Sequence, residues 1–303
     1  MARVAAALPW PKQVVFHVSY AAMRVIDDFV DDDFLAQAPD ERARLLPSAL
    51  ARLEQWRVDA TAAATGRYSP SPGAPDAGEA ILFNALQAVC EPAGAIGPAP
   101  FHALAGALEA DLRERPLPRW SDFHAYAEGA AVAPASIFVT LLATDIDRDF
   151  AGRYSPATPA TDYARALAIF CYLVHILRDL AEDARGHPQL LTVPAEVLAP
   201  LGLDRDSFGA AIRAGDARRV EPAIGAIAGE ARRWRPRALA DVAALSGLIP
   251  PVEGAVIETL FTLYDEQFAA VADAPAAVVA GTAGLPAERV REILADGLPA
   301  APA

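Results

Sequence analysis

The sequence predicts an all-α fold, and three features support this prediction. Alanine and leucine are abundant, runs of β-branched residues are short, and charged residues recur at spacings of three and four. Such features are typical of helices rather than strands. Because 53% of the 303 residues are hydrophobic, the chain can bury a sizeable core and differs from a disordered protein.

The helical pattern divides into elements along the chain. It predicts helices over residues 14–32, 39–64, 79–89, 98–113, 120–142 and 164–184, and further helices up to about residue 272. A loop rich in proline, glycine and serine is expected over 66–78, and a second loop over 145–161. No break in composition separates two halves, so residues 1–272 are predicted to form one domain. The alanine- and proline-rich tail, 273–303, is expected to be poorly ordered apart from a short helix near 287–294.

The composition excludes several classes of protein. A formal net charge of −13 argues against nucleic acid as a partner and against electrostatic docking on anionic lipid. No run of about 18 uncharged apolar residues is found, so no membrane span is expected, and the N-terminal segment is too short for a secretory signal. Cys90 and Cys171 stand far apart, without a histidine cluster. They predict small core residues, no zinc site and a reducing compartment, which indicates a cytoplasmic protein.

A first acidic cluster lies near the end of the predicted helix 14–32. Asp27 and Asp31 are four residues apart, and Asp28 and Asp32 repeat this spacing. On a helix each pair occupies one face, about one turn apart, where like charges destabilise the helix. Arg24 can offset only part of the repulsion, so a further positive charge is expected nearby.

A second acidic cluster lies in the predicted helix 164–184. Asp179 and Asp183 are again four residues apart, Arg178 stands beside them, and apolar residues fill the neighbouring faces. Buried carboxylates without partners are costly. The alternative interpretation of each cluster is a solvated helix face or a helix end.

Two helices that each carry an aspartate pair suit one chemical purpose. Mg²⁺ takes oxygen ligands in octahedral geometry and uses one or two carboxylates together with substrate phosphate and water. Two facing pairs could hold two or three such ions around a diphosphate, and Arg24 and Arg178 could contact the same group. The ions would neutralise the leaving group as its C–O bond breaks.

The segments around these residues resemble the squalene/phytoene synthase family, the head-to-head prenyl diphosphate synthases. The matching segments are SYAAMRVIDDFVDD at 19–32 and ILRDLAED at 176–183, and a weaker match at 108–133 places Asp111 at a further acidic position of the family. The resemblance spans roughly residues 10–270 and is specific in the two aspartate segments. It implies a single helical domain of the isoprenoid synthase type around a deep apolar cavity.

The resemblance also implies an activity and a set of site residues. Two allylic diphosphates of 15 or 20 carbons would condense through a cyclopropylcarbinyl diphosphate. The residues expected to bind Mg²⁺, with Mn²⁺ as an alternative, are Asp27, Asp28 and Asp31 on one wall and Asp179 and Asp183 on the other. Those at positions that contact the diphosphate or shape the pocket are Tyr20, Arg24 and Arg178.

The chain departs from the family pattern at several positions. Tyr172 and His175 stand where the family usually has a glutamine and an asparagine, and Glu128 stands where an aromatic residue is common. Because the asparagine contacts metal, His175 could alter the coordination of a third ion, since imidazole suits Zn, Mn or Fe better than Mg. It could instead donate to the diphosphate or be a core residue. Residues 274–284 carry no charge at the family's basic position, so later rearrangement steps lack support and the chain is expected to be a divergent member.

The sequence leaves three functions open. The leading one is head-to-head condensation of prenyl diphosphates, and the second is a class I terpene cyclase-like enzyme that ionises a single diphosphate with the same aspartates. The third is a non-catalytic assembly or scaffold protein. No glycine-rich dinucleotide motif is found, which leaves an NADPH-dependent reductive step undecided. Because the products would be insoluble in water, transient membrane contact through an apolar surface near the cavity mouth is expected.

Overall fold

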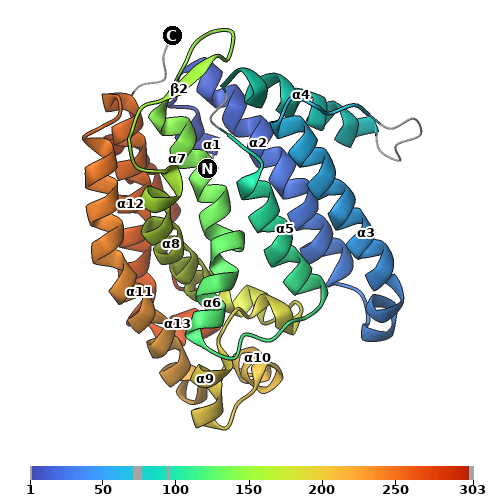
Figure 1. Ribbon diagram of the computed structural model, residues 1–303. Coiled ribbons are helices and arrows are strands. Elements are labelled where there is room, and N and C mark those ends of the chain that lie inside the picture. Colours follow the sequence, from blue (N-terminus) through green and yellow to red (C-terminus); the bar gives the residue numbers. More distant parts are fainter. Residues whose placement is uncertain (1, 71–76, 94–95, 300–303) are drawn as a thin grey trace.

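The fold is seen in a computed structural model that describes residues 2–70, 77–93 and 96–299. This part of the chain is built of helices packed side by side, with one small β-hairpin (Figure 1). The elements are α1 (Ala2–Ala5), α2 (Trp10–Asp28), the π-helix η1 (Phe29–Phe34), α3 (Pro39–Ala64), α4 (Ala77–Ala93), α5 (Ala99–Leu112), α6 (Trp120–Ala127), the π-helix η2 (Glu128–Val132), α7 (Ala133–Ala143), β1 (Thr144–Ile146), β2 (Gly152–Tyr154), α8 (Ala160–Asp183), the 3-10 helix η3 (Pro188–Leu190), α9 (Ala195–Leu198), the 3-10 helix η4 (Ala199–Leu201), α10 (Arg205–Arg213), α11 (Ala217–Ser246), α12 (Pro251–Val271), α13 (Pro275–Ala280) and α14 (Ala287–Gly297).

The predicted all-α class is confirmed, and the predicted helices agree with the observed ones to within a few residues. The expected loop over 145–161 is partly wrong, because β1 and β2 pair as antiparallel strands with Thr144 opposite Tyr154. The turn between them is stabilised by Asp147, whose carboxylate accepts hydrogen bonds from the backbone N–H groups of Asp149 and Ala151. Such local bonds are typical of aspartate in turns. Of the other expected loop, residues 71–76 lie outside the described residues.

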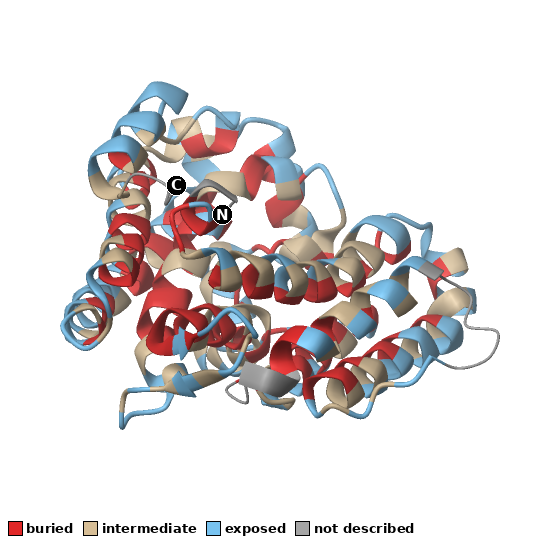
Figure 2. Ribbon diagram, turned by 90° about the horizontal axis from the view of Figure 1, so that it is seen from above, coloured by how far each residue is buried: buried red, intermediate tan, exposed pale blue. Residues whose placement is uncertain are grey.

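The centre of the bundle is α8, which packs against α11, α7 and α12. Its buried face includes Phe170, Leu173, Leu177 and Leu180. Viewed from above, the helices turn their buried faces towards one another and their exposed faces outwards (Figure 2). The second aspartate cluster is therefore carried by the most central helix of the fold, which fixes its position relative to the surrounding walls.

The position of α2 is fixed by a buried ion pair. Lys12 Nζ lies 2.6 Å from Glu253 Oε1 of α12 and donates a second hydrogen bond of 3.1 Å to the carbonyl oxygen of Leu142 at the end of α7. Both charged side chains are 4% exposed. Because α2 carries the first aspartate cluster, this pair helps to hold that cluster against the rest of the bundle.

A close contact between α5 and η2 depends on Gly129. A Cβ atom at this position would lie 2.3 Å from the carbonyl oxygen of Ala103, which is closer than non-bonded atoms approach. Glycine therefore allows η2 to lie directly on α5. This contact brings Asp111 on α5 within reach of Tyr126 on α6.

The tail is more ordered than the sequence suggests. The short helix expected near 287–294 is confirmed as α14, which packs against α12. The expectation of poor order is wrong for the segment before it, where α13 packs against α11. Val278, Val279 and Ile293 are buried. These few apolar side chains anchor a segment whose composition alone resembles a disordered tail.

One helical stretch of the described chain is long and apolar enough to cross a membrane. It runs over Trp120–Ala143, the combined length of α6, η2 and α7, and 61% of its apolar window is buried inside the fold. A core helix of a globular protein has the same properties, and we interpret this stretch as such a helix.

Candidate active site

A polar pocket of about 290 Å³ lies between α2, η1, α5 and α8. Four carboxyl groups from these elements line it, those of Asp27, Asp31, Asp111 and Asp183. The first cluster thus reaches the pocket through Asp27 and Asp31, and the second through Asp183. The two aspartate clusters predicted from the sequence therefore both contribute to the lining of one cavity.

The carboxyl groups of this pocket are held where ionisation is unfavourable. Burial, with repulsion from Asp27 and Asp111, raises the pKa of Asp31 to about 7. Burial, with repulsion from Asp179 and Glu182, raises the pKa of Asp183 to about 7 as well. The pKa of Asp27 is also raised by burial, although Arg24 opposes the shift. A cation in the pocket would relieve this repulsion.

Arg24 offsets part of the negative charge at the pocket edge. It lines the pocket and donates a 2.8 Å hydrogen bond to Asp27 and another to Asp28. Asp28 itself does not line the pocket, and its side chain is 47% exposed. The structure therefore separates Asp28 from Asp27 and Asp31, with which the sequence grouped it.

Asp179 is held by Arg178 on the same helix. Arg178 donates from Nε to Oδ1 at 2.6 Å and from Nη2 to Oδ2 at 2.5 Å, and both residues lie outside the lining of the polar pocket. Arg178 Nη2 also lies 2.7 Å from Nδ1 of His175. The same Nδ1 lies 3.1 Å from Asp179 Oδ2, so His175, Arg178 and Asp179 form one polar cluster on α8. Desolvation by the surrounding pocket walls, as the largest effect, lowers the pKa of His175 and favours its neutral form.

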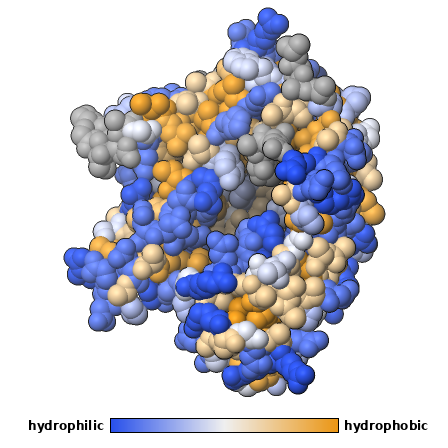
Figure 3. Space-filling view, turned by 180° about the vertical axis from the view of Figure 1, so that it is seen from behind, coloured by the Kyte–Doolittle hydropathy of each residue, from blue (hydrophilic) through white to orange (hydrophobic). Residues whose placement is uncertain are grey.

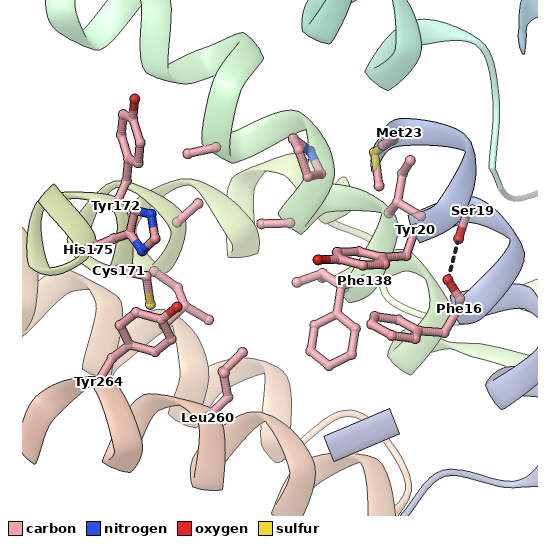
Figure 4. Close-up of a pocket in the computed structure, with 17 residues that line it drawn as sticks. Phe16, Ser19, Tyr20, Met23, Phe138, Cys171, Tyr172, His175, Leu260 and Tyr264 are labelled. Atoms are coloured by element: carbon pink, nitrogen blue, oxygen red, sulfur yellow. Dashed lines mark hydrogen bonds between the residues drawn. The ribbon is translucent and has the colours of Figure 1, made fainter. Parts of the chain in front are cut away.

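An apolar pocket of about 240 Å³ adjoins the polar one. Figure 4 shows Phe16, Tyr20 and Met23 of α2 across from Cys171, Tyr172 and His175 of α8, with Leu260 and Tyr264 of α12 closing another side. Ser19 adds little polarity, because its hydroxyl donates to the backbone carbonyls of Val15 and Phe16. Because most of the lining is apolar, a hydrocarbon chain could occupy this space.

Tyr172 and His175 line both pockets. They form the boundary between carboxylate-lined and apolar space, where the head of an amphipathic substrate would meet its tail. The side chain of His175 is 47% exposed, so the interpretation of His175 as a core residue is wrong. The prediction of a core position is confirmed for Cys90, which is buried, and only in part for Cys171, which packs against the core but also lines the apolar pocket.

Sequence reasoning missed two polar residues of the pocket, Tyr126 and Gln189. The hydroxyl of Tyr126 donates a 2.8 Å hydrogen bond to Asp111 Oδ2, and Gln189 Nε2 donates to Asp111 Oδ1 at 3.1 Å. Tyr126 and Gln189 are separated from Asp111 along the sequence by distances that match no helical repeat. Only the packing of α5 on η2 and of η3 on α10 brings their side chains to Asp111. Glu128, at a divergent position, accepts a 2.7 Å hydrogen bond from Arg165 of α8.

The donors that face the polar pocket suit a hard cation. Within residues 2–70, 77–93 and 96–299, no group of three or more His, Cys, Asp or Glu side chains converges on a point where it could hold a metal ion alone. Mg²⁺ commonly takes only one or two carboxylates from protein and completes its coordination with phosphate oxygens and water. Carboxyl groups with raised pKa values that line one cavity from different helices fit this mode of binding.

The face of the molecule seen from behind carries hydrophilic and apolar side chains side by side (Figure 3). From behind, apolar side chains form scattered patches among hydrophilic ones, and the surface is hollowed near its middle (Figure 3). The large apolar side chains exposed in the described part of the chain are spread over several elements: Trp10, Tyr20, Val58, Ile81, Leu239 and Leu248.

Comparison with known proteins gives a consistent result. The family model described as squalene/phytoene synthase matches residues 1–291. A dehydrosqualene synthase in complex with ligand is similar in structure, with a TM-score of 0.65, 16% identity, and coverage of 97% of this chain and 88% of that chain. Squalene synthase HpnC from Alicyclobacillus acidocaldarius gives a TM-score of 0.64, 18% identity, and coverage of 90% and 88%. TcSQS in complex with a ligand gives 0.68, 14%, and coverage of 97% and 80%. A search of curated proteins found no match.

Proposed function

Since the chain belongs to the squalene/phytoene synthase family, we propose that it is a metal-dependent prenyltransferase that condenses two allylic prenyl diphosphates head to head. The observation that carries the proposal is the junction of the two pockets. Aspartates from two walls face a polar cavity, and an apolar cavity begins at Tyr172 and His175, which line both. A prenyl diphosphate has the same division into a charged head and an apolar tail.

In this proposal each part of the site has one task. Asp27, Asp31 and Asp183 would hold Mg²⁺, or Mn²⁺, together with the diphosphate. Bound in this way, the metal supplies positive charge that stabilises the diphosphate as a leaving group. Arg24 lines the same pocket. Once a metal ion coordinates Asp27, Arg24 would be free to donate hydrogen bonds to the phosphate oxygens. Asp28 and Asp179, now paired with arginines, would join the ligand set only if those pairs opened.

The apolar pocket would protect the cation formed at the allylic carbon. Phe16 and Tyr20 stack with ring centroids 5.7 Å apart, and Tyr172 stacks on Phe123 at 5.8 Å. Aromatic faces attract positive charge and exclude water. The pocket would therefore delay capture of the cation by water until the second substrate reacts.

A second candidate is ionisation of one diphosphate without a second substrate. The modest volume of the apolar pocket, about 240 Å³, favours this alternative, because two long prenyl tails need more space than one. We also retain a cytoplasmic location and transient membrane contact as proposals. Free Cys90 and Cys171 support the former, and the insolubility expected of the products supports the latter.

The test is release of pyrophosphate from 15- and 20-carbon allylic diphosphates with Mg²⁺, Mn²⁺ or EDTA. We expect release with either metal and none with EDTA. Asp27→Ala should abolish it, whereas Asp33→Ala should not, because Asp33 lies on η1 outside the polar pocket and is exposed. Release that is independent of metal, or equal in both variants, would contradict the proposal.

A further inference from the structure

A chain of hydrogen bonds connects the polar pocket with a second cavity. This cavity, of about 810 Å³, is lined by residues that include Arg42, Arg205 and Gln189, and Gln189 also lines the polar pocket. The guanidinium of Arg205 donates to Oε1 of Gln189. Gln189 Nε2 then donates to Asp111 Oδ1 at 3.1 Å. Arg205 thus reaches the pocket from α10 without lining it.

The donors and acceptors of the three side chains fix the direction of these hydrogen bonds, from Arg205 through Gln189 to Asp111. An arginine has only donors, so the oxygen of the Gln189 amide must face Arg205 and its NH₂ group must face Asp111. Asp111 consequently accepts from Gln189 at one oxygen and from the Tyr126 hydroxyl, at 2.8 Å, at the other. Without Arg205 the amide oxygen would lose its donor, and only the hydrogen bonds from Nε2 to Asp111 and, at 3.4 Å, to the carbonyl oxygen of Arg115 would hold the amide.

The members of the chain are buried to different degrees. Gln189 is 7% exposed and Asp111 is 6% exposed, so neither has water as a ready substitute for a lost partner. Their orientation therefore depends on the hydrogen bonds that they make with each other. Arg205 is only half-buried and opens on the second cavity, so it is the one member that can be changed without opening a hole in the core.

We propose that Arg205 is a positioning residue of the candidate active site: through the Gln189 amide it holds Asp111 and Tyr126 in one arrangement at the polar pocket. The inference rests on the proposed function, because Asp111 lines the pocket assigned to the diphosphate. It adds to the site a residue from α10, an element that carries none of the aspartate motifs. Burial raises the pKa of Asp111 to about 6, although the hydrogen bonds from Gln189 and Tyr126 and, as a smaller effect, the charge of Arg205 oppose this shift.

The test compares Arg205→Met, Arg205→Lys, Gln189→Leu and the double variant Gln189→Leu/Arg205→Met. Arg42→Met is the matched control, because Arg42 lines the same cavity but donates to Glu114 and to the carbonyl oxygen of Gln37. We expect Arg205→Met to lower kcat about 10-fold or more with KM within about twofold, as supporting residues behind a site typically do. Arg205→Lys should retain most of the activity, because a single donor suffices to orient the amide.

Non-additivity separates positioning from general destabilisation. If Arg205 acts only through Gln189, the double variant should be no slower than Gln189→Leu alone. An unchanged kcat in Arg205→Met, an equal loss in Arg42→Met, or additive losses in the double variant would overturn the proposal.

A second measurement does not depend on turnover. In the free protein, the side-chain amide protons of Gln189 should exchange slowly with D₂O and lose this protection in Arg205→Met but not in Arg42→Met. Retained protection in Arg205→Met would overturn the positioning role. If the wild-type protein released no pyrophosphate at all, the proposed function would fail, and the amide exchange would still decide the role of Arg205.

Discussion

The substitution Asp31→Asn should make the metal-free protein more stable while abolishing its turnover. In the folded protein, burial together with Asp27 and Asp111 raises the pKa of Asp31 from 3.8 to about 7. Each pKa unit corresponds to about 1.4 kcal/mol, so ionising Asp31 costs the folded state up to about 4 kcal/mol. Asp31 is partly exposed and water screens the charge, so we expect about 2 kcal/mol. Asparagine removes the charge and keeps the shape.

The pH dependence of this effect has a definite sign. Because the folded-state pKa lies above the unfolded value, the cost of ionising Asp31 is absent below about pH 3.8, grows between about pH 3.8 and 7, and is complete above about pH 7. Asp31→Asn should therefore raise Tm by roughly 4 °C at pH 8 and by less at pH 5.

The assay is thermal unfolding in EDTA at both pH values, with Asp33→Asn as the control. Asp33 is exposed on the same helix, so its substitution should change stability by less than about 0.5 kcal/mol. A Tm of Asp31→Asn at or below that of the wild type at pH 8, or an equal gain at both pH values, would refute the reasoning.

Three further predictions concern other parts of the site and its support. Asp183→Asn should lower kcat by about 100-fold or more with the fold intact by circular dichroism, and wild-type rates would exclude Asp183 as a ligand. Lys12→Met leaves Glu253 buried without its partner and should lower the free energy of unfolding in urea by about 3–5 kcal/mol. The double variant with Glu253→Leu should recover most of this loss. No recovery would show that the loss does not come from an unpaired buried charge. Gly129→Ala should cost about 1–3 kcal/mol or more, because its Cβ would meet a carbonyl oxygen of α5, and an unchanged unfolding midpoint would show that η2 can move away freely.

The sequence was informative where chemistry and helical periodicity coincide. Asp27 and Asp31 share a helix face and reach the same pocket, and the second cluster reaches it through Asp183. The family resemblance is confirmed by the match over residues 1–291. The roles assigned to Tyr20, Arg24, Arg178, Tyr172 and the aspartates stay predictions, because the structure gives their positions but not their action.

The features that the sequence could not predict depend on contacts between distant segments. Arg178 is one residue from Asp179, yet whether it binds a diphosphate or neutralises that aspartate depends on side-chain rotamers. Tyr126 and Gln189 become part of the site only because separate elements bring them to Asp111. The order of the tail likewise follows from a few buried side chains, among them Val278 and Ile293, and not from its overall composition.

The most direct test of the central claim is the identity of the product. The purified protein is incubated with 15- or 20-carbon allylic diphosphates and Mg²⁺, with and without NADPH, and organic extracts are analysed by mass spectrometry against EDTA controls. The account predicts a metal-dependent hydrocarbon or cyclopropylcarbinyl diphosphate with twice the carbon number of the substrate, and the NADPH arm decides whether a reductive step follows. Products that keep the carbon number of the substrate, or no product from a well-folded protein, would contradict head-to-head condensation.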